Sequence, residues 1–335
     1  MSTITNDFEL ALSQLSSGKV VAIPTETVYG LAGDATNPLT VQKIYSMKQR
    51  PADHPLIVHV HKDFDLMSLV SYIPEYAKKL ISAFWPGSLT LVLPVIPGKV
   101  NAFVTGGQQT VAIRCPDHPL AQRLLRLLNT PLVAPSANPF KKISPTTAQH
   151  VQASFPNEEL VILDGGRCTI GIESTIVLAT DTTHYQILRQ GGIDKESLQQ
   201  ISSGYLQFAE KNVRVPGQLA QHYQPTKPLY YFNSTEALKT FINKHTHLSL
   251  YLMCFQRLAS NYSIAFDHQY QFPTNQKQVS FELYYQLRKA DESSADCILI
   301  EMPSAQLGWE SISERIHKAG RPLESYGEKA VDFVR

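Results

Sequence analysis

Two cations and a group of hydroxyls are the residues whose types and spacing suggest chemistry. Lys48 and Arg50 lie two residues apart. Lysine offers a point charge and arginine a planar fork, and the combination suits a phosphate or a carboxylate. Upstream, Thr25, Glu26 and Thr27 bunch polar groups together. The segment is therefore predicted to bind an anion. The alternative is a solvated helix end, because cations are favoured there by the helix dipole.

The elements around these residues are predicted to be strand, helix, loop and strand. The apolar run 19–23 is typical of a buried strand, and Pro24 ends its ladder because proline has no N–H. Asn37 is suited to cap a helix that runs to about Lys48, with proline in its first turn. The run 55–60 predicts a second strand, so the cations lie in the connection before it.

Further polar residues follow predicted strands. Open α/β sheets place ligands at strand ends, because the loops there gather polar groups over an apolar floor. Strand order is not readable from the sequence, and the alternative is that strands simply end in polar residues. The residues in this position are Thr27, His59, Arg114, Ser136, Asp164 and Arg189.

The first two hundred residues continue to alternate strands and helices. Asp117 is predicted to cap the helix that carries Leu120, Leu124 and Leu128. Ser144, followed by a proline, is predicted to cap a helix over 146–155. Further strands are predicted over 88–95, 110–114, 131–135, 160–164, 174–179 and 185–189.

Composition and charge exclude several classes of protein. The chain has 335 residues, 43% hydrophobic and 18% charged, which indicates an ordinary globular protein of two domains. A net charge of +1 argues against a broad surface that coats nucleic acid. We expect no membrane segment, since no apolar run approaches about 20 residues, and no secretory signal at the N-terminus. The four cysteines show no C-x-x-C pair, so we expect reduced thiols in the cytoplasm and no zinc site.

The composition changes after residue 204. Residues 205–228 are rich in proline and polar residues and have little apolar periodicity, which predicts a linker. Strands and helices resume at 229 and continue to the last helix, predicted over 310–319. Residues 229–335 are therefore predicted to form a small α/β domain, without a P-loop or a G-x-G-x-x-G motif.

An ordered set of motifs resembles the YrdC-like family, whose members make L-threonylcarbamoyladenylate. Each fragment is short, but together they span nearly the whole chain in the family's order. VPGQLAQHYQP resembles the interdomain segment of the family's long, two-domain form. The fragments before it are PTETVYGL, KQRP, PLIVHV, FWPGSLTLVLP, TVAIRCPDHP, APSAN, ISPTTAQHV, DGG, GIESTIV and ILRQGGI.

The resemblance implies a fold and a reaction. The fold is a YrdC-like twisted mixed sheet with flanking helices and a concave ligand cleft over residues 1–204, a linker covering the site, and a smaller Rossmann-like α/β domain. The reaction joins L-threonine, bicarbonate and ATP, with Mg²⁺ carried by the ATP and no metal ligand from protein side chains. It releases pyrophosphate and leaves L-threonylcarbamoyl-AMP, which a separate transferase uses to modify certain tRNAs. A weak tRNA contact of this chain is left open.

The resemblance also assigns residues position by position. Lys48 and Arg50 match the catalytic pair, which also contacts the nucleotide. Arg114 is the natural partner of threonine's carboxylate, and Ala134 offers only backbone groups. The other threonine positions are Thr27, His59 and Ser174. The other ATP positions are His54, Thr110, Ser136, Asn138, Ser144, Arg189 and, in the linker, Tyr223.

The chain departs from the family pattern mainly in loops. KGRP is KQRP here, and His54 replaces a usual asparagine. The loop after Asn138 reads PFKKI without Ser-Gly, LRPG is LRQG, STIVD is STIVL and PGM is PGQ. These changes bear on turn geometry and rate more than on the class of reaction.

Two other functions compete. Carbamoyl transfer, as in hydrogenase-maturation proteins with a YrdC-like module, would bring zinc-finger cysteine pairs and an acylphosphatase segment, and neither is visible. A YrdC-like surface that only binds RNA is the other. The near-zero net charge weakens it, because phosphate contacts need clustered Lys and Arg.

Overall fold

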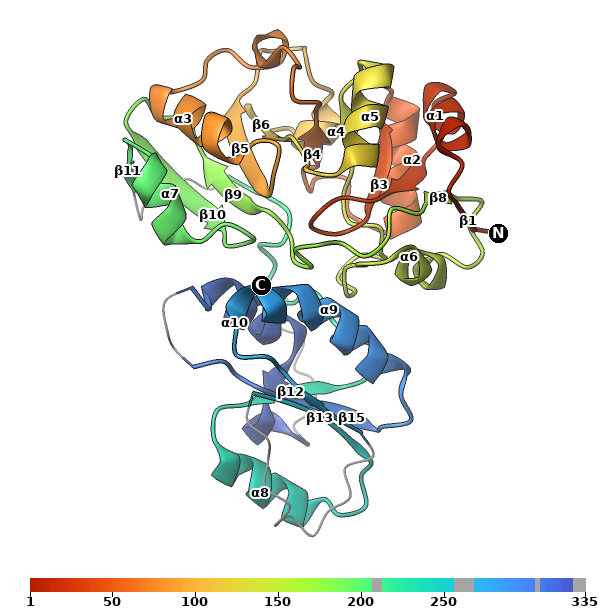
Figure 1. Ribbon diagram of the computed structural model, residues 1–335, viewed down its shortest axis with the longest axis vertical. Coiled ribbons are helices and arrows are strands. Elements are labelled where there is room, and N and C mark those ends of the chain that lie inside the picture. Colours follow the sequence, from red (N-terminus) through yellow and green to blue (C-terminus); the bar gives the residue numbers. More distant parts are fainter. Residues whose placement is uncertain (207–212, 256–267, 305–307, 328–335) are drawn as a thin grey trace. The chain divides into compact units, whose positions relative to one another are not determined.

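The computed structural model describes residues 1–206, 213–255, 268–304 and 308–327 (Figure 1). The chain divides into two compact units. The N-terminal unit holds residues 1–140 and 144–219, and the C-terminal unit holds residues 141–143 and 220–335. The change from one unit to the other at residue 219 lies inside the segment 205–228 that was predicted to be the linker.

The N-terminal unit is a mixed α/β layer structure (Figure 1). Its strands are β1 (Thr3–Thr5), β2 (Val21–Ile23), β3 (Gly30–Asp34), β4 (Ile57–His59), β5 (Leu89–Pro94), β6 (Thr110–Arg114), β7 (Leu132–Val133), β8 (Val161–Leu163), β9 (Thr175–Leu178), β10 (His184–Arg189) and β11 (Tyr205–Leu206). Its helices are α1 (Phe8–Ser16), α2 (Pro38–Lys48), α3 (Glu75–Phe84), α4 (Ala102–Thr105), α5 (Pro119–Leu128), α6 (Ala148–Ser154) and α7 (Lys195–Ile201), with a 3₁₀ turn at Leu66–Ser68.

The eleven strands described in this unit form one sheet in the order β1-β8-β2-β3-β7-β4-β6-β5-β9-β10-β11. β4 and β6 are parallel, as are β5 and β9, whereas β5 pairs with β6 and β9 with β10 in antiparallel fashion. The mixed directions mean that neighbouring strands bring both beginnings and ends to each edge of the sheet. A functional edge can therefore collect residues from either end of a strand.

Both faces of this sheet are covered, which explains its continuous apolar strands. On β2, Ala22 belongs to the larger core, whereas Val21 and Ile23 belong to a second core beneath α1 and α5. A third apolar cluster covers β4, β5, β6 and β9, and Val215 of the predicted linker packs into it. This part of the segment, at Val215, is thus anchored to the N-terminal unit.

Two predicted helix caps are wrong. The N-cap of α5 is His118 and not Asp117, because the backbone N–H of Asp117 donates to a carboxylate oxygen of Glu26 at 2.9 Å. The N-cap of α6 is Thr147, whose hydroxyl accepts from the N–H of His150. Ser144 lies outside that helix. Glu26 thus binds the backbone N–H of Asp117, and Glu173 binds the Ser144 hydroxyl that the prediction assigned to the helix end.

The C-terminal unit is a parallel sheet with helices on both faces, α9 and α10 on one and α8 on the other (Figure 1). The strand order is β14-β13-β15-β12-β16, and every described pair is parallel. The elements are β12 (Leu229–Phe232), α8 (Thr235–Lys244), β13 (Leu250–Cys254), β14 (His268–Gln271), α9 (Gln276–Glu292), β15 (Cys297–Glu301), α10 (Glu310–Ala319), β16 (Arg321–Pro322) and a 3₁₀ turn at Leu323–Ser325. Across the described residues of both units, no helix has the length and apolar character needed to cross a bilayer.

Candidate functional site

Strand register brings four of the predicted residues to one edge of the N-terminal sheet. His59 at the end of β4 pairs with Arg114 at the end of β6, and Arg114 pairs with Thr90 of β5. β5 in turn pairs with β9, directly after Ser174, and β9 pairs with β10, which ends at Arg189. The strand-end pattern in the sequence thus marks a real edge for His59, Arg114 and Arg189, and Ser174, assigned by the resemblance, joins them from the start of β9.

Arg114 is buried and held on three sides. Its Nε donates to the carbonyl of Gly87 at 3.3 Å, and its Nη1 donates to the hydroxyl of Thr27 at 2.8 Å. Its Nη2 forms an ion pair with the carboxylate of Glu26. The loop after β2 therefore reaches the end of β6 through Thr27 and Glu26. The guanidinium sits in a fixed orientation between them.

His59 is a neutral imidazole at this edge. Burial, reinforced by the positive charge of Arg114, lowers the pKa of His59 to about 3. Its Nδ1 lies 3.1 Å from the carbonyl oxygen of Ile57. A neutral ring that donates from Nδ1 keeps its Nε2 as an acceptor. His59 can therefore accept a hydrogen bond from an amine or a hydroxyl at neutral pH.

Ser174 and Arg189 form the neighbouring part of the edge. The hydroxyl of Ser174 lies 2.8 Å from that of Thr90, and Nη2 of Arg189 donates to the Ser174 hydroxyl at 3.1 Å and to its carbonyl at 2.9 Å. Nη1 of Arg189 donates to the carbonyl of Pro216 at 3.0 Å. The bend after β10 depends on Gly191, because a Cβ there would lie 2.4 Å from backbone atoms of residues 173–175.

Lys48 is the last residue of α2 and is buried. Its Nζ donates to the carbonyls of Ser136 and Asn138, the latter at 2.6 Å. Burial, with the nearby charge of Arg50, lowers the pKa of Lys48 well below its ordinary value. The ammonium is therefore aimed by two backbone carbonyls of the loop after β7.

Arg50 is a second buried cation beside Lys48. Its Nη2 donates to the carbonyl of Pro55 at 2.9 Å, and its guanidinium lies 5.6 Å from the ring centre of Phe140. Its Nε is buried without a hydrogen-bond partner. Burial, with a contribution from the charge of Arg189, lowers the pKa of Arg50 to about 10. Within the part of the chain that the structure describes, neither Lys48 nor Arg50 forms an ion pair with a carboxylate.

The remaining predicted residues of this unit lie in strands of the same sheet and in the loops that connect them. Asn138 is buried, and Ser136 is bridged to Gly30 in the sheet. The ring of His54 packs edge-on against Phe140 at 5.4 Å, next to Arg50. Buried Ala134 directs its N–H to the carbonyl of Ile57 at 3.4 Å. Thr110 begins β6 and so lies at the end opposite Arg114.

Tyr223 belongs to the C-terminal unit. Its ring is buried, 4.1 Å from the ring of His222 and 5.5 Å from that of Tyr284, and the guanidinium of Arg315 lies 5.6 Å from it. Its contact with a nucleotide stays a prediction.

Sequence reasoning missed two buried carboxylates. Glu26 binds Arg114, and Glu173 accepts a hydrogen bond from the hydroxyl of Ser144 at 2.6 Å. Both stand inside motifs that were used for their hydroxyl residues, PTET and GIEST. A carboxylate does not itself bind an anion, so its residue type gives no hint of the site. The only hint in the sequence is that Glu26 and Glu173 stand directly beside Thr27 and Ser174.

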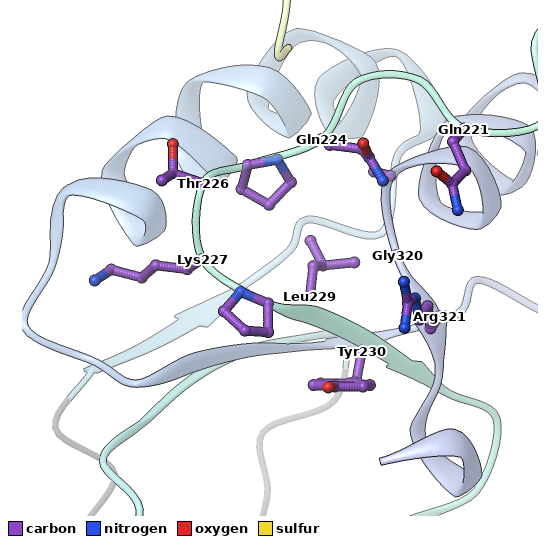
Figure 2. Close-up of a pocket in the computed structure, with 11 residues that line it drawn as sticks. Gln221, Gln224, Thr226, Lys227, Leu229, Tyr230, Gly320 and Arg321 are labelled. Atoms are coloured by element: carbon purple, nitrogen blue, oxygen red, sulfur yellow. The ribbon is translucent and has the colours of Figure 1, made fainter. Parts of the chain in front are cut away.

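Two cavities in the described residues lie away from these groups. One of about 490 Å³ is lined by α1, α2 and the segment before β8. The other, of about 300 Å³, lies in the C-terminal unit before β12 and β16 (Figure 2). Figure 2 shows the side chains of Lys227 and Arg321 on opposite sides of that pocket, so they do not form a paired cationic site.

Comparisons with known proteins identify the family of this chain. The Sua5/YciO/YrdC family model, described as "Telomere recombination", matches residues 13–191. The model described as "Threonylcarbamoyl-AMP synthase, C-terminal domain" matches residues 193–320. The chain belongs to the Sua5/YciO/YrdC family. The two matches together give the long, two-domain form of that family.

Several Sua5/YciO/YrdC relatives cover most of the chain. Threonylcarbamoyl-AMP synthase of Bacillus subtilis is 39% identical, with 94% of each chain covered. The protein of the same name from Schizosaccharomyces pombe is 33% identical, covering 89% of this chain and 84% of its own. The crystal structure of P. abyssi Sua5 in complex with L-threonine matches with a TM-score of 0.83 and 30% identity, over 96% of this chain and 98% of that one. The expected YrdC-like fold with a second α/β domain is confirmed.

Proposed function

We propose that this chain synthesises L-threonylcarbamoyl-AMP from L-threonine, bicarbonate and ATP and releases pyrophosphate, the first step of tRNA threonylcarbamoyladenosine modification. One observation carries the proposal beyond family membership. Lys48 and Arg50 are buried without a carboxylate partner among the described residues, and the pKa of each is lowered by burial and by a neighbouring cation. Buried cations that repel one another are stabilised by a bound anion. A nucleotide triphosphate is such an anion.

The group around Arg114 fits the amino acid. Its guanidinium retains two N–H groups beyond its three contacts, and these suit a carboxylate. Neutral His59 and the hydroxyls of Thr27 and Ser174 offer acceptors for an amine or a side-chain hydroxyl. Buried Ala134 contributes backbone only.

The group around Lys48 fits the nucleotide. In this proposal Lys48 and Arg50 bind phosphoryl oxygens and stabilise the charge that develops there. Arg189 supplies a third charge beside Ser174. The other proposed ATP contacts are His54, Thr110, Ser136, Asn138, Ser144 and Tyr223.

The chemistry requires no protein nucleophile. The amine of threonine attacks the carbon of bicarbonate, and a carbamate forms as a C–O bond breaks and water leaves; with carbon dioxide derived from bicarbonate, the same carbamate forms by addition and loss of a proton from the nitrogen. A carbamate oxygen then attacks the α-phosphorus of ATP, and the bond from that phosphorus to the bridging oxygen breaks as pyrophosphate leaves. The protein has to hold the two substrates in line and stabilise charge on the phosphoryl oxygens.

Mg²⁺ is proposed as part of the ATP substrate. Mg²⁺ is usually bound through substrate phosphates and water, with few protein carboxylates. Two buried carboxylates near the site have other partners, Glu26 with Arg114 and Glu173 with Ser144. We also propose that the product passes to a separate transferase. We propose that the reaction takes place in the cytoplasm, because tRNA is found there and the four free cysteines suit a reducing compartment.

The test is pyrophosphate release from MgATP on the purified chain, with and without L-threonine and with bicarbonate removed. We expect release that depends on both. Lys48→Ala should abolish it, whereas Lys43→Ala should not, because Lys43 on the same helix forms only an exposed ion pair with Glu158. No release from a folded protein would refute the proposal. Salt-dependent RNA binding would then be examined.

A further inference from the structure

Glu26 is a buried carboxylate to which the proposed reaction assigns no role. It is 4% exposed, and both of its oxygens are engaged. Oε1 pairs with Nη2 of Arg114, and Oε2 accepts the backbone N–H of Asp117 at 2.9 Å. The carboxylate therefore joins the loop after β2 to the end of β6 and the turn that follows it.

The backbone of Glu26 has an anchor of its own. Its carbonyl accepts the N–H of Ile170 at 2.7 Å, and its neighbour Thr25 bonds through its hydroxyl to the carbonyl of Val28 at 2.7 Å. The loop is thus held independently of the Glu26 side chain. What the carboxylate adds is the orientation and the neutralisation of Arg114.

The charged surroundings of Glu26 are few. Burial raises the pKa of Cys115 to about 11 and that of Cys168 to about 12, so both nearby thiols are neutral. Burial lowers the pKa of His118, which is therefore neutral as well at pH 7. Arg114 is the cation that faces Glu26. The pair carries no net charge.

The two cationic groups of the site therefore differ in one respect. Arg114 forms an ion pair with a carboxylate, whereas Lys48 and Arg50 form none among the described residues, and the charge of Asp53 is only a minor influence on Arg50. A polyanion gains most electrostatic binding energy beside cations whose charge is not balanced by a carboxylate. A guanidinium that is paired with a carboxylate contributes mainly directed hydrogen bonds. Specificity between two ligands often rests on a group that disfavours the wrong one.

We propose that Glu26 is a positioning and specificity-determining residue that sorts the two anionic substrates. It fixes Arg114 so that its two remaining N–H groups meet the carboxylate of threonine, and its negative charge disfavours the triphosphate at that place. The inference rests on the proposed function, because it assumes that threonine and ATP are the ligands.

Glu26→Gln tests both parts of this role. The amide keeps the size of the side chain but loses the charge and one of the two acceptor oxygens, so it cannot accept from both Arg114 and the N–H of Asp117. By calorimetry we expect threonine to bind at least tenfold more weakly. Tripolyphosphate, a stand-in for the nucleotide's phosphates, should compete with threonine in the variant but not in the wild type. In steady state the KM for threonine should rise at least tenfold while that for ATP stays within twofold.

Two further variants separate this role from a structural one. Glu158→Gln removes an exposed carboxylate of the same unit, paired with Lys43 at 3.3 Å, and should change none of these constants. Glu26→Asp keeps the charge on a shorter side chain that cannot reach both partners. It should weaken threonine binding by less than the glutamine variant and should still exclude tripolyphosphate. If Glu26→Gln does not fold, Glu26→Asp alone tests the positioning role through its threonine affinity.

The inference is overturned if Glu26→Gln binds threonine as tightly as the wild type and tripolyphosphate still does not compete, provided that the wild type is active in the pyrophosphate assay. Equal losses for threonine and ATP also overturn it, because they indicate a general structural defect. A wild-type chain that neither binds threonine nor releases pyrophosphate overturns the proposed function, and the inference with it.

Discussion

Replacing Arg50 by methionine should leave the ligand-free protein about as stable as the wild type and remove its response to nucleotide. Three features of the wild-type guanidinium have opposing effects on the free energy of unfolding. Burial lowers its pKa to about 10, it donates to the carbonyl of Pro55 at 2.9 Å, and it lies 5.6 Å from the ring of Phe140. The side chain is a site residue in the proposed function and a poor stabiliser of the fold.

The magnitudes support this expectation. One pKa unit corresponds to about 1.4 kcal/mol, so a fall from the ordinary arginine value of about 12.5 represents roughly 3 kcal/mol of destabilisation by the charge. Methionine removes that cost. It also loses a charged hydrogen bond of about 1.5–3 kcal/mol and a cation–π contact of about 0.5–1 kcal/mol. The free energies of unfolding of the two proteins should therefore agree within about 1 kcal/mol.

The matched control is Arg114→Met in the same unit. Arg114 is also buried but is paired with Glu26, and removing one partner of a buried pair costs about 3–5 kcal/mol. Urea unfolding should thus separate two buried arginines that differ in their partners.

The nucleotide response completes the test. MgATP at a hundred times its dissociation constant stabilises the wild type by about 2.7 kcal/mol, and this increment should vanish in Arg50→Met. The pKa of folded Arg50 is depressed, so its destabilisation is constant below pH 10 and is relieved only above it. The difference between the two proteins should therefore not change from pH 6 to 9. A loss of 3 kcal/mol or more without ligand would refute the reasoning.

Four further expectations concern single positions. Gln49 ends α2 at φ +52°, a conformation that costs a non-glycine residue about 1 kcal/mol, so Gln49→Gly should raise the free energy of unfolding in urea by about that amount; a decrease would contradict it. Arg114→Ala should abolish threonine binding by calorimetry, and Lys48→Ala should abolish turnover; unchanged affinity in the first or an unchanged rate in the second would contradict these roles. The pKa of His59 is about 3 in the fold, below its unfolded value, so stability is lost as pH falls from about 6.5. From pH 6.5 to 5 the wild type should lose about 1.5–2 kcal/mol more than His59→Gln, and equal losses would contradict a neutral buried ring.

The sequence predicted the elements well where local chemistry decides them. Asn37 caps α2 as expected, with its side chain accepting from the N–H groups of Leu39 and Thr40. Asp194 and Ser234 cap α7 and α8 in the same way. β3 was missed, because the glycine-rich Gly30–Asp34 has little apolar signal. Its strand conformation is fixed by pairing with β2 and β7, which no local pattern reports.

Local sequence patterns could not predict that the site residues lie close together in the fold. The sequence placed His59 and Arg114 at strand ends, and only the parallel register of β4 and β6 makes them neighbours. Arg189 joins them through three further strand pairs, β6 with β5, β5 with β9 and β9 with β10. Such contacts depend on strand order, which non-local pairing sets.

Glu26 shows why a cation is easier to read from a sequence than its counterion. Lys48 and Arg50 lie two residues apart at the end of one helix, so their spacing alone suggests anion binding. Glu26 and Arg114 are 88 residues apart and meet only after the loop following β2 folds against the end of β6. Before that contact is known, Arg114 looks as uncompensated as Arg50, and a phosphate would suit either. The distinction between a site for a monocarboxylate and a site for a polyphosphate therefore depends on a carboxylate that only the tertiary structure brings to one of the two arginines.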